Sequence, residues 1–244
     1  MVSILFFVFA FFAEVAGTMA GFGSSTLFLP LALLFFDFKT ALLLVAIFHI
    51  SGNLGRLTFF RHGLDRNLLL RFGIPSVIAT VIGALLVNLI VQDVLKLVLG
   101  IFLLAYVFFA WHGQRSFKPT KQNSLIGASL SGFFAGLIGT GGALRGAFLS
   151  AFKLKKSVYL ATAAAISLSG DLMRIPIYFG SGFLSPNLYY LIPILFVIAI
   201  FASFTGKKVV TKIPQKTFRK WVLFAIALAS LTFIYSGMRA VLLF

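Results

Sequence analysis

The stretch SGDLMR, residues 169–174, places an aspartate and an arginine inside an otherwise apolar run. The stretch SGNLGR, 118 positions earlier at residues 51–56, repeats Ser, Gly, Leu and Arg in register and has Asn53 where the later copy has Asp171. In a chain rich in Leu and Gly, a match of this length can arise by chance. A second match is needed before it indicates a duplication.

A second pair of similar stretches keeps almost the same spacing, AGTMAGFGSS at 16–25 and AGLIGTGGAL at 135–144. Two matches in the same order along the chain indicate an internal repeat. We therefore expect a first repeat at residues 1–111, a cytoplasmic linker at 112–123 and a second repeat at 124–244.

The composition predicts a membrane protein without a soluble domain. Of its 244 residues, 60% are hydrophobic and 11% are charged. Several apolar runs reach the roughly 20 residues that cross a bilayer as a helix. Because lipid cannot satisfy backbone hydrogen bonds, and because the runs lack strict apolar/polar alternation, we expect an all-α polytopic fold. The expected apolar segments are 2–36, 40–60, 67–91, 94–111, 124–152, 157–179, 188–206 and 221–237.

The formal net charge of +16 is explained by membrane topology rather than by nucleic-acid binding, since no nucleic-acid-binding motif lies among the basic residues. The absence of cysteine excludes disulfides and thiolate chemistry. The N-terminus has no basic segment before its apolar run, so we expect no cleaved signal peptide.

Glycines interrupt the first apolar segment of each half near its middle. The interrupting residues are Gly17, Gly21, Gly23, Ser24, Ser25 and Thr26 in the first half and Gly136, Gly139, Thr140, Gly141 and Gly142 in the second. Such paired interruptions indicate broken or re-entrant helices at a transporter's binding site. The alternative is close helix packing through small residues.

The distribution of basic residues predicts that the two halves are inverted. If each Gly-broken element returns to its starting side, the three remaining spans of each half make an odd number of crossings. One side then collects 15 of the 21 basic residues, namely Arg61, Arg66, Arg71, Arg115, Lys118, Lys121, Lys153, Lys155, Lys156, Lys207, Lys208, Lys212, Lys216, Arg219 and Lys220. The opposite side keeps Lys39, Lys96 and Arg239. We expect the basic side to be cytoplasmic and both termini to be extracytoplasmic, in a cell inner (plasma) membrane.

Three arginines, Arg56, Arg145 and Arg174, lie inside apolar segments, where each must face protein or a water-filled cavity. A guanidinium matches the oxygens of an oxyanion, and the helix breaks can add N-terminal amides. These features favour a site for a sulfonate, sulfite, carboxylate or phosphate-like anion. The alternatives are a structural pair with Asp171 for Arg174 and a side chain that reaches the membrane surface for Arg56.

Two acids and one histidine remain as candidates for proton coupling or for local pairing. Asp171 either titrates or neutralises Arg174, and Glu14 either carries protons or lies near the outer surface. His49 lies one turn before Asn53 on the same helix face and can bind a ligand or a neighbour. The three histidines are scattered, so we expect no metal site and no cofactor.

The two Gly-rich stretches resemble those of the TauE/SafE family of sulfite and organosulfonate exporters. Each half of such proteins opens with a glycine cluster of the GxGGG type, commonly followed by a proline, and the resemblance covers nearly the whole chain. GFGSS with Pro30 resembles the first cluster, and GTGGALR resembles the second. Ser24 and Ser25 replace glycines, and Leu149 stands where the second half would carry proline.

Together, these features predict a secondary transporter that exports a small sulfur-containing oxyanion by alternating access. An anion channel is the alternative, and an integral-membrane lipid-processing enzyme is a weaker one because five acids are spread over the chain. The expected partners are the oxyanion and membrane lipid. The expected substrate-binding residues are Gly21, Gly23, Ser24, Ser25, Asn53, Arg56, Gly139, Thr140, Gly141, Gly142, Arg145, Asp171 and Arg174.

Overall fold

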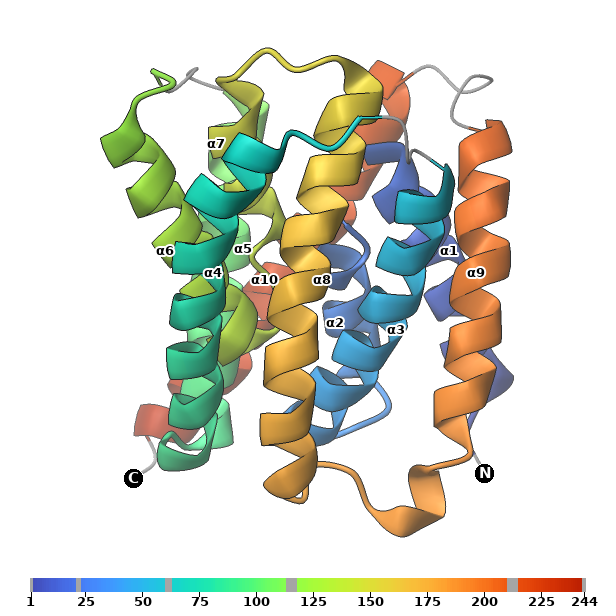
Figure 1. Cartoon of the computed structure of the whole chain (residues 1–244). Helices are drawn as coiled ribbons and strands as arrows, with labels where there is room; N and C mark the ends of the chain where they lie inside the picture. The colour runs from blue at the N-terminus through green and yellow to red at the C-terminus, as the bar shows by residue number, and fades with distance from the viewer. Residues whose placement is uncertain (1, 21–22, 60–62, 113–117, 210–214, 243–244) are drawn as a thin grey trace.

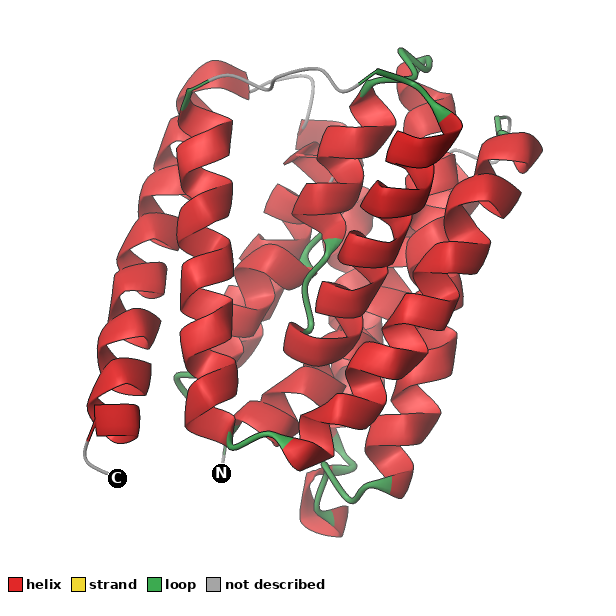
Figure 2. Cartoon of the chain, turned by 90° about the vertical axis from the view of Figure 1, so that its left-hand side faces the viewer, coloured by secondary structure: helices red, strands yellow, loops and turns green. Residues whose placement is uncertain are grey.

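The computed structural model describes residues 2–20, 23–59, 63–112, 118–209 and 215–242. Within these ranges the regular secondary structure is entirely helical, in agreement with the predicted all-α fold (Figure 2). The elements are α1 Ile4–Ala20, α2 Ser25–Ala32, α3 Phe38–Phe59, α4 Arg66–Leu86, η1 Val87–Leu89, α5 Gln92–Trp111, α6 Lys121–Ile138, α7 Gly142–Ser150, α8 Lys156–Gly180, η2 Pro186–Leu188, α9 Leu191–Val209 and α10 Gln215–Leu242.

Six of the described helices are long and apolar enough to cross a membrane, which confirms the prediction of a multi-pass membrane protein. They are α3, α4, α5, α8, α9 and α10, and each coincides with an expected apolar segment. The boundaries differ by a few residues. α10 extends furthest beyond its expected segment, by six residues at its start and five at its end.

The first apolar segment of each half is broken into two helices, as the glycines predict. α1 and α2 flank residues 21–24, and α6 and α7 flank residues 139–141. Gly23 and Gly139 have φ angles of 93° and 72°, a left-handed conformation that glycine adopts without steric cost. α6 begins at Lys121, inside the expected linker, because Thr120 caps it by accepting a hydrogen bond from the Asn123 amide at 3.1 Å.

Each broken element doubles back on itself. α1 begins at the lower end of the bundle in Figure 1, and α3 begins at that same end after α2. α6 begins at the upper end, and α8 begins there after α7 (Figure 1). The two broken elements therefore enter the bundle from opposite ends.

The basic residues gather at one end of the bundle. α4, α6 and α8 begin and α9 ends at the upper end of Figure 1, and basic residues lie at each of these four helix ends. Lys39, Lys96 and Arg239 lie near the helix ends at the lower end, where the chain also begins and ends. The positions 61, 115 and 212, which the topology prediction also used, lie outside the described residues.

The helices pack in pairs that join the two halves of the chain. α4 packs along α6, α1 along α9, α5 along α10 and α3 along α8. The α4–α6 contact is very close because small residues line it. A Cβ atom on Gly136 would lie 2.8 Å from the Ala84 nitrogen, and one on Gly83 would lie 2.9 Å from the Leu137 nitrogen. Gly136 therefore serves close packing, the alternative considered for the glycine clusters.

Candidate functional site

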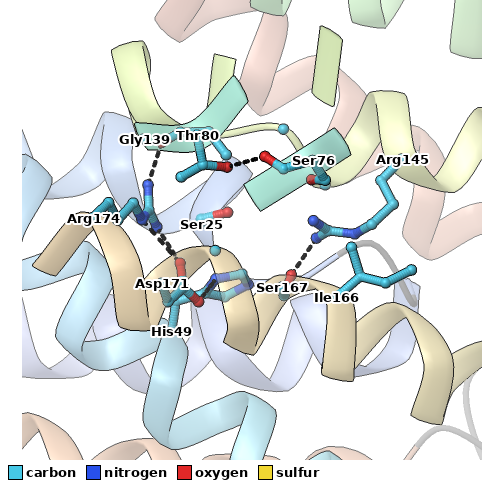
Figure 3. A pocket seen from close by; sticks show the side chains of 14 residues that line it. Ser25, His49, Ser76, Thr80, Gly139, Arg145, Ile166, Ser167, Asp171 and Arg174 are labelled. Carbon is cyan, nitrogen blue, oxygen red and sulfur yellow. Dashed lines mark hydrogen bonds and ion pairs between the residues drawn. The ribbon is translucent and has the colours of Figure 1, made fainter. Parts of the chain in front are cut away.

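A small polar cavity lies where the two broken elements meet α3, α4 and α8 (Figure 3). Its volume is about 10 Å³, which is room for about one water molecule. It is lined by Ser25, His49, Ser76, Thr80, Ala135, Gly139, Gly141, Gly142, Arg145, Ile166, Ser167, Gly170, Asp171 and Arg174.

Arg174 is paired on its own helix. Its Nη2 lies 2.8 Å from Asp171 Oδ1, its Nε donates to the same oxygen at 2.9 Å, and its Nη1 donates to the Ala135 carbonyl. The other oxygen of Asp171 accepts from Asn53 Nδ2 at 3.2 Å and contacts His49 Nδ1 at 2.9 Å. The structure thus contains the Arg174–Asp171 pair that the sequence offered as the alternative to a free anion ligand.

Arg56 is paired as well, with a carboxylate from another helix. Its Nη2 donates to Glu14 Oε1 at 2.7 Å and its Nη1 donates to Asn53 Oδ1 at 2.9 Å. Glu14 Oε1 also accepts from Ser203 at 2.7 Å and from Thr18 at 3.1 Å. Arg56 is 4% exposed and Glu14 is fully buried, so neither reaches a surface of the bundle, and neither lines the cavity.

Arg145 differs from the other two arginines because no carboxylate of the described chain lies within 4.0 Å of it. It is 5% exposed, extends from α7 into the cavity and donates from Nη2 to the hydroxyl of Ser167 (Figure 3). A buried guanidinium without an anionic partner is costly, so a water-filled or anion-occupied cavity is its natural surrounding.

His49 lines the cavity with one ring nitrogen engaged. Nδ1 faces Asp171, whereas Nε2 is buried and has no hydrogen-bond partner among the described residues. The backbone of Gly23 approaches this nitrogen so closely that a Cβ there would lie 2.6 Å from Nε2. The sequence placed His49 and Asn53 on one helix face, and both contact Asp171.

The remaining predicted residues fall into two groups. Ser25, Gly139, Gly141 and Gly142 line the cavity together with Arg145, Asp171 and Arg174. Gly23, Ser24, Asn53, Arg56 and Thr140 are outside its lining, and Gly21 lies outside the described residues. Thr140 instead shares a 2.7 Å hydrogen bond with Thr26, which joins the two broken elements.

Sequence reasoning missed the polar residues that α4 and α8 contribute. Ser76 and Thr80 are one turn apart on α4, and Ser167 lies one turn before Asp171 on α8. Small hydroxyl side chains at a spacing of four within an apolar span were the available signal, because such spacing places them on one helix face. The described residues include no group of three or more His, Asp or Glu that could hold a metal ion.

One comparison with known proteins gives a match. The family model described as Sulfite exporter TauE/SafE matches residues 6–233, which is nearly the whole chain. Comparisons with curated proteins and with solved structures give no match.

Proposed function

This chain belongs to the sulfite exporter TauE/SafE family, and on that premise we propose that it exports a small sulfur-containing oxyanion by alternating access. The family is one of transporters rather than enzymes. The observation that carries the proposal within the site is Arg145, a buried cation that faces the cavity without a carboxylate among the described residues.

The charges of the polar cluster favour an anion as the ligand. Three buried arginines face only two buried acids, since Glu14 pairs with Arg56 and Asp171 pairs with Arg174. With neutral His49, one positive charge remains, and it lies on Arg145. A bound anion would neutralise this charge, whereas a cation would add to it.

Two helix N-termini support the same ligand. α7 begins at Gly142 and α2 begins at Ser25, and both residues line the cavity. The first-turn amides of a helix have no acceptor within the helix, and their partial positive charge favours anions. The broken helices are therefore suited to bind oxyanion oxygens beside Arg145.

The packing of the helices supports inverted repeats and a rocking motion. If α1 to α5 correspond to α6 to α10, the α4–α6 contact corresponds to the α9–α1 contact, and the α3–α9 contact corresponds to the α8–α4 contact. A cavity of about 10 Å³ is too small for a sulfur oxyanion, so the cavity must widen before one binds, as it would if the two halves moved apart. The Thr26–Thr140 hydrogen bond joins the broken elements where that movement would occur.

The orientation follows from the charges of the loops. We place the basic end of the bundle in the cytoplasm of a cell inner membrane, with both termini on the other side. An inside-negative potential drives anions outward by about 2.3 kcal/mol per charge per 100 mV, so export needs no coupling ion in principle.

The test is efflux of sulfite, taurine-like sulfonates and sulfate from proteoliposomes that hold wild type, Arg145→Gln or the control Arg71→Gln. Arg71 is an exposed basic residue of α4 outside the cavity lining. We expect saturable sulfite or sulfonate efflux, accelerated by an inside-negative potential, that Arg145→Gln lowers at least about tenfold and Arg71→Gln preserves.

Three results would contradict parts of this proposal. Rapid conductance without counterflow would indicate an anion channel instead of a carrier. Equal fluxes in wild type and Arg145→Gln would show that the transported anion does not bind at Arg145 in this cavity. Absence of flux for every sulfur oxyanion would show that the proposed substrate class is wrong.

A further inference from the structure

The imidazole of His49 offers a proton acceptor that the fold itself does not use. Nδ1 lies 2.9 Å from Asp171 Oδ2, and an ionised carboxylate only accepts hydrogen bonds, so Nδ1 carries the ring proton. Nε2 then presents its lone pair. This nitrogen is buried and has no hydrogen-bond partner among the described residues.

The imidazole of His49 lines the same cavity as Arg145. His49 extends from α3 on one side and Arg145 from α7 on another, and both side chains line the cavity (Figure 3). The ring can occupy this position because Gly23 has no side chain, and a Cβ there would lie 2.6 Å from Nε2. The glycine break thus makes room for the histidine.

The charged groups around the imidazole come from four helices. Asp171 and Arg174 lie on α8 and form one pair, and Arg56 of α3 pairs with Glu14 of α1. Arg145 of α7 has no carboxylate partner in the described chain. With His49 neutral, the cluster carries one positive charge, and a monoanion balances it.

A proton on Nε2 changes this balance. It raises the net charge of the cluster to two, which only a dianion balances. In the empty cavity the same proton would leave two uncompensated positive charges within one small buried volume, an arrangement that a low-dielectric interior strongly disfavours.

We propose that His49 takes up a proton at Nε2 when a dianionic sulfur oxyanion occupies the cavity and stays neutral when a monoanionic one does. In this step a buffer acid in the bulk solution gives up a proton and is left as its conjugate base. The proton forms a bond to the Nε2 lone pair, and the resulting N–H donates to the anion. Nδ1–H continues to donate to Asp171, and no other bond changes. The inference rests on the proposed function and specifies the protonation state of His49 when that site binds a monoanion or a dianion.

The consequence is that sulfite dianions and sulfonate monoanions leave the cell with the same net charge. A dianion accompanied by one proton and a monoanion alone each remove one negative charge, so the membrane potential drives both equally. By linkage, dianion affinity falls about tenfold per pH unit wherever one proton accompanies binding, and monoanion affinity does not.

Titration calorimetry of the purified full-length protein, in buffers with different ionisation enthalpies, counts the protons taken up on binding. The probes are sulfate and thiosulfate as dianions and methanesulfonate as a monoanion, because none of the three titrates near neutral pH. We expect about one proton per dianion and about none per monoanion. His49→Gln should bind dianions without proton uptake, whereas the control His112→Gln, at an exposed position, should retain it.

The outcomes separate the two proposals. Three results would overturn the role of His49 while leaving an anion site in place. The first is equal proton uptake on binding of both anion classes, and the second is proton uptake on dianion binding that persists in His49→Gln. The third is binding of monoanions alone. If none of the anions binds the wild type, the proposed function fails, and the role of His49 fails with it. Proton counts on the wild type decide the matter even if His49→Gln does not fold.

Discussion

The two similar stretches SGNLGR and SGDLMR each contain a buried arginine but pair it with different carboxylates. Arg174 pairs with Asp171, three residues earlier on α8, at 2.8 Å. Arg56 has Asn53 at the corresponding position, and its carboxylate, Glu14, comes from α1 at 2.7 Å. The Arg174–Asp171 pair lines the cavity and the Arg56–Glu14 pair does not. Both stretches therefore bury an arginine, whereas tertiary packing determines its partner, and only the Arg174 pair lies at the cavity.

The difference also changes what each pair holds together. Arg174 and Asp171 both lie on α8, and hydrogen bonds link them to the Ala135 carbonyl on α6 and to His49 and Asn53 on α3. Glu14 joins α1 to Arg56 on α3 and to Ser203 on α9. The Arg56–Glu14 ion pair therefore joins two helices, whereas the Arg174–Asp171 ion pair lies within one.

The largest effect on stability is expected for Glu14→Ala. This change leaves Arg56 buried without a carboxylate and removes the acceptor for Ser203, which should lower the free energy of unfolding by about 3–5 kcal/mol. Unfolding of the purified protein in denaturing detergent measures the loss. The double variant E14M/R56M should recover most of it, because it removes both charges, and wild-type stability of Glu14→Ala would show that the pair contributes nothing.

A smaller loss is expected for Arg174→Gln. Asp171 loses its arginine but keeps the donors His49 and Asn53, so the free energy of unfolding should fall by about 2 kcal/mol. The same unfolding measurement compares the two copies directly. If Arg174→Gln destabilises the protein as much as Glu14→Ala, the two pairs are structurally equivalent and the proposed difference between them is wrong.

A still smaller effect is expected where the two broken elements meet. Thr26→Val and Thr140→Val should each lower the free energy of unfolding by about 1 kcal/mol, because each leaves one buried hydroxyl without its partner. The double variant should cost less than the sum of the two single changes, with a coupling of about 1 kcal/mol in a double-mutant cycle. Strict additivity would mean that the two hydroxyls do not interact in solution.

The smallest effect on stability is expected for Arg145→Gln. No carboxylate of the described chain depends on this arginine, so its replacement should change the free energy of unfolding by less than about 1 kcal/mol while transport is lost. Unfolding and efflux measured on the same preparation test both statements. A loss as large as that of Glu14→Ala would identify Arg145 as a structural residue.

The apolar spans and the helix breaks were predictable from the sequence because both depend on local properties. Hydropathy over about 20 residues fixes where a helix can cross a bilayer. Glycine clusters fix where the backbone can leave the helix, as the positive φ angles of Gly23 and Gly139 illustrate. The Arg174–Asp171 pair was also foreseeable, since a spacing of three places both side chains on one helix face.

Tertiary packing is what brings each buried arginine to a carboxylate or leaves it without one. Glu14 and Arg56 are 42 positions apart, and His49 and Asp171 are 122 positions apart, so no local pattern links them. Local sequence patterns predict that arginines lie in apolar spans and that glycines interrupt two helices. The packing of α1 against α9 and of α3 against α8 gives Arg56 and Arg174 a carboxylate each and leaves Arg145 at the cavity without one. The physical reason is that a buried charge is stabilised by whichever groups the fold brings within a few ångströms of it.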